Sequence, residues 1–226
     1  MVASKFSLLF KPTLLDCLIN TSSAMSDFKL LEGLSSLPLN DQIALSHFGQ
    51  GPNQPVPFSR VHEAFESVVD TYPDSVAAVS EQASLTYQEL DNAANRLANS
   101  LLESGLQPRE RICLVVSRSL EMLVGIFAVL KAGCQYVPID GGVASDKQLT
   151  HIFADTVARH VLCSPKFQSR VKQFTRADAH VTPLSLHVVS DSSSGRPLVK
   201  CSSTDGCYAI YTSGTYSLIT NKVLHS

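Results

Sequence analysis

Residues 111–140 read RICLVVSRSLEMLVGIFAVLKAGCQYVPID, and this stretch decides the fold. Its first part, Arg111–Ser117, is a nearly continuous apolar run, which is typical of a strand buried on both faces of a parallel sheet. Ser119–Gly133 predicts a helix that ends at a glycine, and CQYVPID then returns the chain as a second strand. A strand, a helix and a strand joined by short connections predict a βαβ unit with a right-handed crossover.

The sequence before this unit predicts two further helices. In VHEAFESVVDT, residues 61–71, the apolar positions fall on one helical face, and a short strand is expected at Val76–Ser80. The next helix opens with a T-x-x-E capping box made by Thr86 and Glu89, and Gly105 is expected to end it.

The sequence after the unit continues the alternation of helices and strands. A helix from Asp146 to about Thr156 precedes the strand HVLC, and residues 190–206 form a Ser-rich connection that we expect to be mobile, with Pro197–Lys200 briefly paired. The last strand, in CYAIYTSGT, enters a Ser/Thr/Gly loop. The chain is therefore predicted to be an α/β protein of layered βαβ units, with a mostly parallel sheet flanked by helices.

The chain divides into three parts by composition. Residues 1–46 form a leader of uncertain order, residues 47–59 a Pro/Gly-rich extended linker, and residues 60–226 the folded domain. For residues 1–24 two interpretations stay open, a poorly ordered or misassigned leader and a targeting segment, and Met25 opens an ordinary cytosolic start.

Composition excludes several classes of function. The 226 residues are 44% apolar and 17% charged, with a formal net charge of -2. Lysine and arginine are not clustered, so neither a nucleic acid nor an anionic membrane is an expected partner, and the broken apolar run around Lys11-Pro12 is too short to span a membrane. The cysteines sit in apolar runs without C-x-x-C spacing, which is typical of a reduced cytoplasmic protein, and the histidines show no metal-ligand spacing. The six cysteines are Cys17, Cys113, Cys134, Cys163, Cys201 and Cys207.

The loop after the last strand carries the candidate binding residues, Thr212, Ser213, Gly214 and Thr215. Glycine lets successive backbone N–H groups turn toward one point, and the hydroxyl groups add donors, so this loop is suited to phosphate oxygens. An ordinary turn after a strand has the same composition, and it remains the alternative when the loop is considered alone.

Three stretches in order resemble the adenylation domains of non-ribosomal peptide synthetases, which belong to the superfamily of AMP-forming acyl and aminoacyl ligases. They are LTYQEL at 85–90, LKAGCQYVPID at 130–140 and YTSGT at 211–215, and the resemblance covers roughly residues 47–215. The sequence PIDGGVASDKQLTHI lacks the Tyr-Pro and Arg that are usual after the second motif, which indicates a divergent branch such as the fungal synthetases or synthetase-like reductases. Residues 60–226 are thus identified as a partial AMP-binding domain, the amino-terminal part of the ligase's large subdomain.

The resemblance implies a two-step reaction that uses ATP and Mg. A carboxylic or amino acid attacks the α-phosphate of ATP to give an acyl-adenylate and pyrophosphate, and the acyl group then passes to a thiol, often the phosphopantetheine of a carrier protein. It implies that Thr212–Thr215 hold the β- and γ-phosphates, and that the first two motifs are structural. It places the acid pocket, the Mg ligand and the catalytic lysine downstream of this loop, so we expect no catalytic residue among these residues.

The sequence departs from the resemblance after Thr215. The family pattern continues T-G-x-P-K-G, whereas Tyr216 and Ser217 follow here, Thr220 stands at the lysine position, and Lys222 comes two residues late. We therefore expect a truncated phosphate loop at 211–226, and two functions stay open: the amino-terminal part of an ATP-dependent ligase, or a non-catalytic fragment that at most binds nucleotide phosphate weakly. A dinucleotide-binding Rossmann domain fits the βαβ pattern, but no G-x-G-x-x-G follows the first strand.

Overall fold

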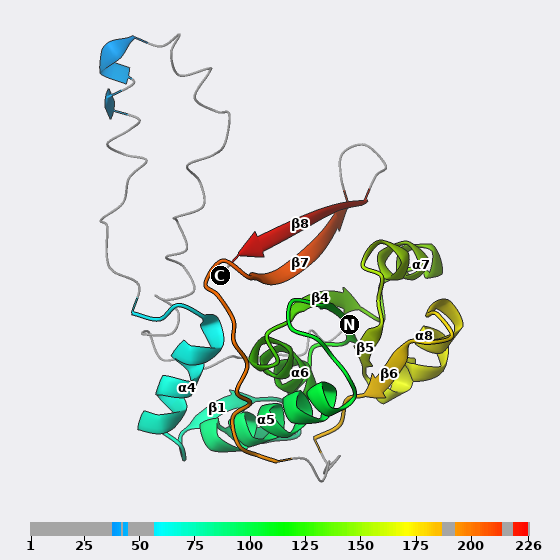
Figure 1. Cartoon of the computed structure of the whole chain (residues 1–226), viewed down its shortest axis with the longest axis horizontal. Helices are drawn as coiled ribbons and strands as arrows, with labels where there is room; N and C mark the ends of the chain where they lie inside the picture. Colours follow the sequence, from blue (N-terminus) through cyan, green and yellow to red (C-terminus); the bar gives the residue numbers. More distant parts are fainter. Residues whose placement is uncertain (1–37, 42, 45–56, 187–192, 214–218, 226) are drawn as a thin grey trace.

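A computed structural model describes residues 38–41, 43–44, 57–186, 193–213 and 219–225 (Figure 1). The predicted leader therefore lies largely outside the described residues, as does most of the predicted linker. Within the described ranges, no helix is both long enough and apolar enough to cross a membrane.

Two helices and a small antiparallel hairpin form the first layer. These elements are α4 (Val61–Thr71), β1 (Val76–Val79), β2 (Ser84–Thr86) and α5 (Tyr87–Glu103). The predicted capping box is confirmed, because the Glu89 backbone N–H donates to Thr86 Oγ1 at 3.2 Å and the Thr86 N–H donates to Glu89 Oε2 at 2.8 Å. Gly105 follows the end of α5 with a φ of 93°, a left-handed conformation that glycine adopts without strain.

A six-stranded sheet forms the centre of the domain. Its strands are β3 (Arg111–Val116), β4 (Gln135–Asp140), β5 (His160–Cys163), β6 (His180–Pro183), β7 (Gly206–Ser213) and β8 (Ile219–His225). The strand order is β6-β5-β3-β4-β7-β8, in which the first five strands are parallel and β8 runs antiparallel to β7. The predicted α/β fold with a mostly parallel sheet is confirmed.

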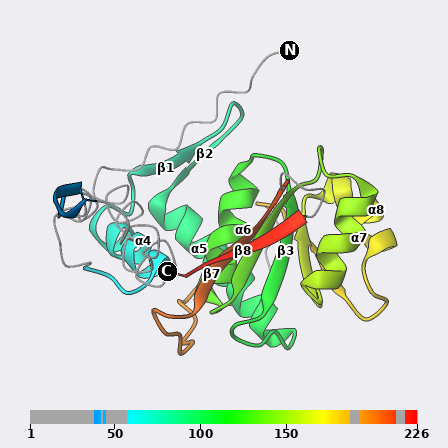
Figure 2. The same cartoon turned by 90° about the horizontal axis from the view of Figure 1, so that it is seen from above.

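Helices cover both faces of this sheet. They are α6 (Leu120–Lys131), α7 (Asp146–Asp155) and α8 (Gln168–Phe174), with a short 3₁₀ turn, η2 (Pro165–Phe167), before α8. Figure 2 shows α5 and α6 on one side of the sheet and α7 and α8 on the other. In β3, Leu114 packs toward α5 and α6, whereas Val115 packs toward α7 and α8. Alternate side chains of one strand fill two cores, which explains the continuous apolar run.

Four features of the structure differ from the expectations or were absent from them. The helix α8 and the strand β6 were not predicted, and β8 pairs with β7 as a hairpin where only the remainder of a loop was expected. The expected pairing of Pro197–Lys200 is wrong, because the described chain is not a strand there. The connection at residues 193–205 is held by side-chain contacts and not by the hydrogen bonds of a strand ladder.

Candidate functional site

The predicted phosphate loop begins at the end of β7. Thr212 and Ser213 are the last two residues of this strand, and they lie opposite Thr220 and Ile219 of β8. Gly214 and Thr215 lie outside the described residues. Of the four candidate residues, the structure thus places only Thr212 and Ser213, at the end of β7 in a hairpin that projects from the body of the domain in Figure 1.

The strand β7 is attached to the parallel sheet at few points. Among the described residues it pairs with β4 in register only at Tyr208, which lies opposite Tyr136, and the two rings stack with centroids 5.4 Å apart. By contrast, β3 pairs with β4 at all six positions from Arg111 to Val116. On its β4 side, β7 is therefore attached by less of a backbone ladder than β3 is.

Tyr211, the residue before Thr212, contacts the helix α7. Its hydroxyl group donates a hydrogen bond to Asp155 Oδ2, and its ring meets the His151 ring edge-on with centroids 6.2 Å apart. Burial, and then the hydrogen bond to the Asp155 carboxylate, raises the pKa of Tyr211 above its ordinary value. The phenol consequently stays protonated and serves as a donor that fixes the end of β7.

Arg170 of α8 organises the loop that follows β4. Its guanidinium donates to the carbonyl oxygens of Gly141 and Ala144 at 3.0 and 2.6 Å, and it pairs with Asp146 Oδ1 at 2.6 Å. Gly141 is required here because an added Cβ would lie 2.4 Å from the Phe167 ring. The loop at the carboxyl end of β4 is thus held by a fork of charge-assisted hydrogen bonds.

Cysteine and metal chemistry receive no support from the described residues. Burial raises the pKa of Cys113 and Cys134 to about 12 and that of Cys163 and Cys207 to about 11, so these free thiols are not thiolate nucleophiles at neutral pH. Across the ranges that the structure describes, no three His, Cys, Asp or Glu side chains gather as metal ligands.

The first two motifs have structural roles in this geometry. Leu90 of LTYQEL is buried in the core between α4, α5 and α6, and Thr86 and Glu89 cap α5. In LKAGCQYVPID, Gly133 has a φ of 72°, and a Cβ there would lie 2.7 Å from Cys201 Sγ. The motifs therefore define how the helices and strands meet.

The sequence comparison identifies the family. The sequence pattern of the family described as AMP-binding enzyme matches residues 65–217. The chain belongs to this family. Adenylate-forming reductase 06235 of Coprinopsis cinerea is 38% identical over 183 residues, which are 80% of this chain and 18% of the reductase. N-(5-amino-5-carboxypentanoyl)-L-cysteinyl-D-valine synthase of Penicillium rubens is 38% identical over 188 residues, which are 82% of this chain and 5% of the synthase.

Solved structures of AMP-binding enzymes share the fold. The non-ribosomal peptide synthetase FmoA3 in its AMPPNP-bound form superposes with a TM-score of 0.70 at 24% identity, over 81% of this chain and 19% of that one. The chain thus spans less than a fifth of the length of the first relatives that it matches. The α/β layers described above are those of an adenylate-forming domain.

Sequence reasoning missed the side chains that support the site of this AMP-binding protein. Arg170 lies 29 residues after Gly141, and Asp155 lies 56 residues before Tyr211, so no local pattern connects these pairs. The H-x-x-x-D spacing of His151 and Asp155 on α7 is the one signal that could have indicated a shared helical face.

Proposed function

We propose that this chain contributes the phosphate-binding part of an ATP-dependent adenylating enzyme. The observation that carries the proposal is the segment YTSGT at the end of β7, inside a match to AMP-binding enzymes that runs from residue 65 to 217. In this reaction an oxygen of a carboxylic or amino acid attacks the α-phosphorus of ATP. The bond to the bridging oxygen breaks, and the products are an acyl-adenylate and pyrophosphate.

The role proposed for Thr212, Ser213, Gly214 and Thr215 is to hold the β- and γ-phosphates. Thr212 and Ser213 pair with Thr220 and Ile219 of β8, and the proposal assigns the anion to backbone N–H groups of the Ser/Thr/Gly sequence that follows them. Fixed donors of this kind accelerate phosphoryl and nucleotidyl transfer by positioning and by neutralising charge.

The proposal extends to partners that the family implies. Mg²⁺ would arrive with ATP and bind phosphate oxygens, since magnesium is usually held by few protein ligands together with substrate phosphates. The acyl group would pass to the phosphopantetheine thiol of a carrier protein, as proposed from the synthetase relatives. A cytoplasmic location is also proposed, and the free, buried cysteines support it.

We further propose that these 226 residues do not complete the reaction alone. The matched region corresponds to 18% of the reductase, and the family resemblance places the acid pocket and the catalytic lysine after Thr215. The alternative is a non-catalytic fragment that only binds phosphate weakly. The departure from T-G-x-P-K-G after Thr215 favours that alternative.

Pyrophosphate exchange tests the first half of this proposal. The chain is incubated with ATP, labelled pyrophosphate and a panel of amino and aryl acids. We expect no exchange above the blank, because whole groups of positioned residues lie outside the matched region and removing even one such group costs orders of magnitude in rate. Robust exchange with any acid would show that the chain is a complete catalyst.

Nucleotide binding tests the second half. We expect Mg·AMPPNP to bind more tightly than AMP, because AMP lacks the β- and γ-phosphates. Gly214→Ala should weaken AMPPNP binding about tenfold, since a Cβ restricts the turn. Gly51→Ala lies outside the family match and is the control. Equal binding of AMPPNP and AMP, unaffected by Gly214→Ala, would reject the phosphate loop.

A further inference from the structure

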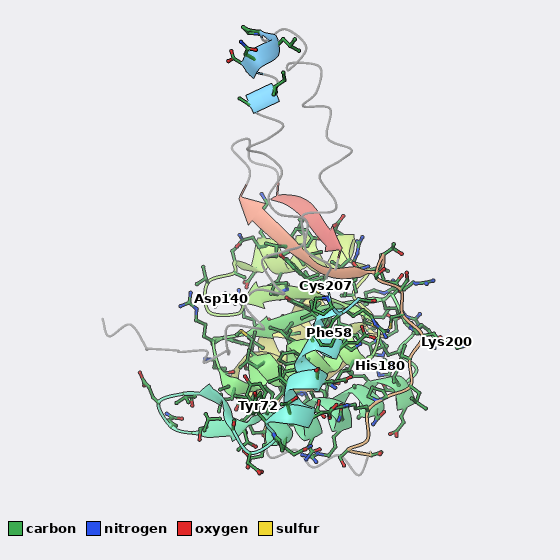
Figure 3. The ribbon with its side chains drawn as sticks, turned by 90° about the vertical axis from the view of Figure 1, so that its left-hand side faces the viewer. Phe58, Tyr72, Asp140, His180, Lys200 and Cys207 are labelled. Atoms are coloured by element: carbon green, nitrogen blue, oxygen red, sulfur yellow. The ribbon has the colours of Figure 1, made fainter. Side chains whose placement is uncertain are left out.

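The connection that leads into β7 is fastened to the first layer of helices. Residues 193–205 run past α4, α5 and α6 before β7 begins at Gly206, and Lys200 marks this connection in Figure 3. Two asparagines on α5 bind its backbone. Asn95 Nδ2 donates to the Ser194 carbonyl at 2.9 Å, and Asn99 Nδ2 donates to the Ser193 and Gly195 carbonyls at 2.7 and 2.9 Å.

Arg196 supplies the charged part of this attachment. Its guanidinium forms a bidentate pair with Asp70 on α4, in which the nitrogen–oxygen distances are 2.7 and 3.1 Å, and Nη2 also donates to the Glu66 carbonyl at 3.3 Å. Its Nε lies 3.8 Å from Glu66 Oε1 and 3.7 Å from Asp91 Oδ2. One side chain of the connection thereby contacts carboxylates on both α4 and α5.

A buried lysine lies beneath these carboxylates. The Lys131 side chain of α6 is 1% exposed, and its Nζ pairs with Glu66 and with Asp91 Oδ1, the latter at 2.9 Å. The side chain of Asp91 is 4% exposed. Three carboxylates, those of Glu66, Asp70 and Asp91, therefore share two cations. Removing Arg196 would leave Lys131 as the one cation beside the carboxylates of Glu66 and Asp91, which is unfavourable because these groups are largely buried.

The far end of the connection has a second, weaker anchor. Arg109 Nε donates to Asp205 Oδ1 at 2.8 Å, and the same carboxylate accepts the Ser202 backbone N–H at 2.8 Å. The Arg109 side chain is 67% exposed, so solvent screens this pair. The Arg196 side chain is 36% exposed, but it also lies near the carboxylates of Glu66 and Asp91, which are 17% and 4% exposed, so Arg196 is the stronger of the two anchors.

We propose that Arg196 is a positioning residue that sets where β7, which carries Thr212 and Ser213 of the candidate phosphate site, lies on the domain. The inference rests on the proposed function for the loop, and it follows from the single register pair between β7 and β4. A partly buried cluster of ion pairs adds little to the stability of a fold, because apolar side chains of similar size in its place can give a protein that is as stable. Its hydrogen bonds are directional, so they specify how the two segments that they join are positioned. The cluster therefore acts on the placement of β7 more than on the stability of the fold.

Hydrogen exchange of the whole chain tests this proposal. Arg196→Ala should raise exchange in the peptide 206–213 about tenfold while the peptide 111–116 stays protected, and Arg196→Lys should restore only part of the protection because lysine lacks the bidentate fork. Unchanged exchange at 206–213 would overturn the proposal. An equal rise in both peptides would do so too, because it would show a general loss of stability.

A second variant guards against failure of Arg196→Ala to fold. Asp70 is 63% exposed and lies on the outside of the cluster, so Asp70→Asn should fold and should raise exchange at 206–213 about threefold. Asp178→Asn is the matched control, since Asp178 is 62% exposed and forms a similar pair with Arg176. No difference between the two variants at 206–213 would contradict the role of Arg196.

Nucleotide binding separates this inference from the proposed function. Arg196→Ala should raise the Kd for Mg·AMPPNP about threefold at a temperature where both proteins are fully folded, and leave the Kd for AMP unchanged. If the unaltered chain binds no AMPPNP, the proposed function fails, and exchange at 206–213 still decides whether Arg196 positions β7.

Discussion

The strands β3 and β7 are held in the same sheet by different means. β3 pairs in register with β4 on one side and β5 on the other, and every residue after Arg111 is buried. Among the described residues, β7 has one register pair with β4 and seven with β8, and side-chain contacts of Arg196, Asp205 and Tyr211 attach it and the chain before it to helices and loops of the domain. Apolar burial and ladders on both sides secure β3, whereas β7 combines some apolar burial at Cys207 and Ala209 with polar side-chain contacts near both of its ends.

The different attachments of β3 and β7 bear on how easily each strand can move. A strand fixed by apolar packing unfolds only with the whole domain, whereas a strand fixed by a few polar contacts can move separately at a lower free energy. Loops that bind ligands are commonly drawn from such parts of a protein. The two strands should therefore respond differently to substitution, to acid and to the removal of backbone strain.

The largest difference between β3 and β7 is expected when a buried side chain of the core is shortened. Leu114 is fully buried, and its Cδ1 packs against Gly125 so closely that an added Cβ would lie 2.9 Å away. Leu114→Ala should cost about 4 kcal/mol of the free energy of unfolding, because it removes apolar contact and leaves a cavity. Ala209→Gly, at a buried position of β7, should cost about 1 kcal/mol. Urea denaturation of both variants measures these costs, and a cost below about 2 kcal/mol for Leu114→Ala would contradict the tight packing around β3.

The part of the fold that could be predicted is the part that apolar burial secures. The sequence RICLVV identified β3, and Gly133 and Gly105 identified two helix ends, because these signals are local. The strand β6 escaped prediction because HVTP is short, contains a proline and has few apolar residues. The cluster around Arg196 could not be predicted, since Arg196 and Asp70 are 126 residues apart.

Only part of the candidate site could be predicted, because only part of it depends on residues that are close in the sequence. The letters YTSGT mark the end of β7, but its attachment through Asp155 depends on the crossing of α7 and β7 in three dimensions. No pattern in a single sequence reports a pair of that kind. A polar contact between distant segments depends on the three-dimensional arrangement of one fold, whereas the apolar periodicity of helices and strands follows the same rules in every protein.

Acid should lower the stability of the core and thereby narrow the difference in hydrogen exchange between β3 and β7. Burial lowers the pKa of His62 on α4 to about 4, and burial also lowers the pKa of His160 on β5, against the opposing effect of Glu110. An unfolded histidine titrates near 6.5, so the unfolded chain takes up these protons first as the pH falls. Their full contribution to stability is therefore present above about pH 6.5 and is lost as the pH falls toward about 4.

We expect this loss to be roughly 2 kcal/mol, after allowing for partial solvent screening. Denaturant unfolding between pH 7 and pH 4.5 measures it, and His62→Gln should flatten the profile. Because β7 carries no histidine, exchange at 111–116 should rise toward that at 206–213 in acid. A profile without slope over this range, or one that His62→Gln leaves as steep as before, would refute the assignment.

The smallest effects concern two residues with left-handed backbones. Val157, after α7, has a φ of 51° and is 56% exposed, and Arg109, before β3, has a φ of 72°. Such a conformation costs a β-branched residue about 1 kcal/mol, so Val157→Gly should stabilise the protein by about that amount. Thermal unfolding measures the gain.

Arg109→Gly relieves the same kind of strain but also removes the ion pair with Asp205, which is worth less than about 1 kcal/mol because the Arg109 side chain is 67% exposed. We therefore expect its unfolding free energy to change little, while exchange at 206–213 rises because β7 has lost an anchor. Val157→Gly should leave that exchange unaltered, since Val157 belongs to the region that apolar packing secures. If Arg109→Gly left 206–213 as protected as before, the pair between Arg109 and Asp205 would be dispensable for the position of β7.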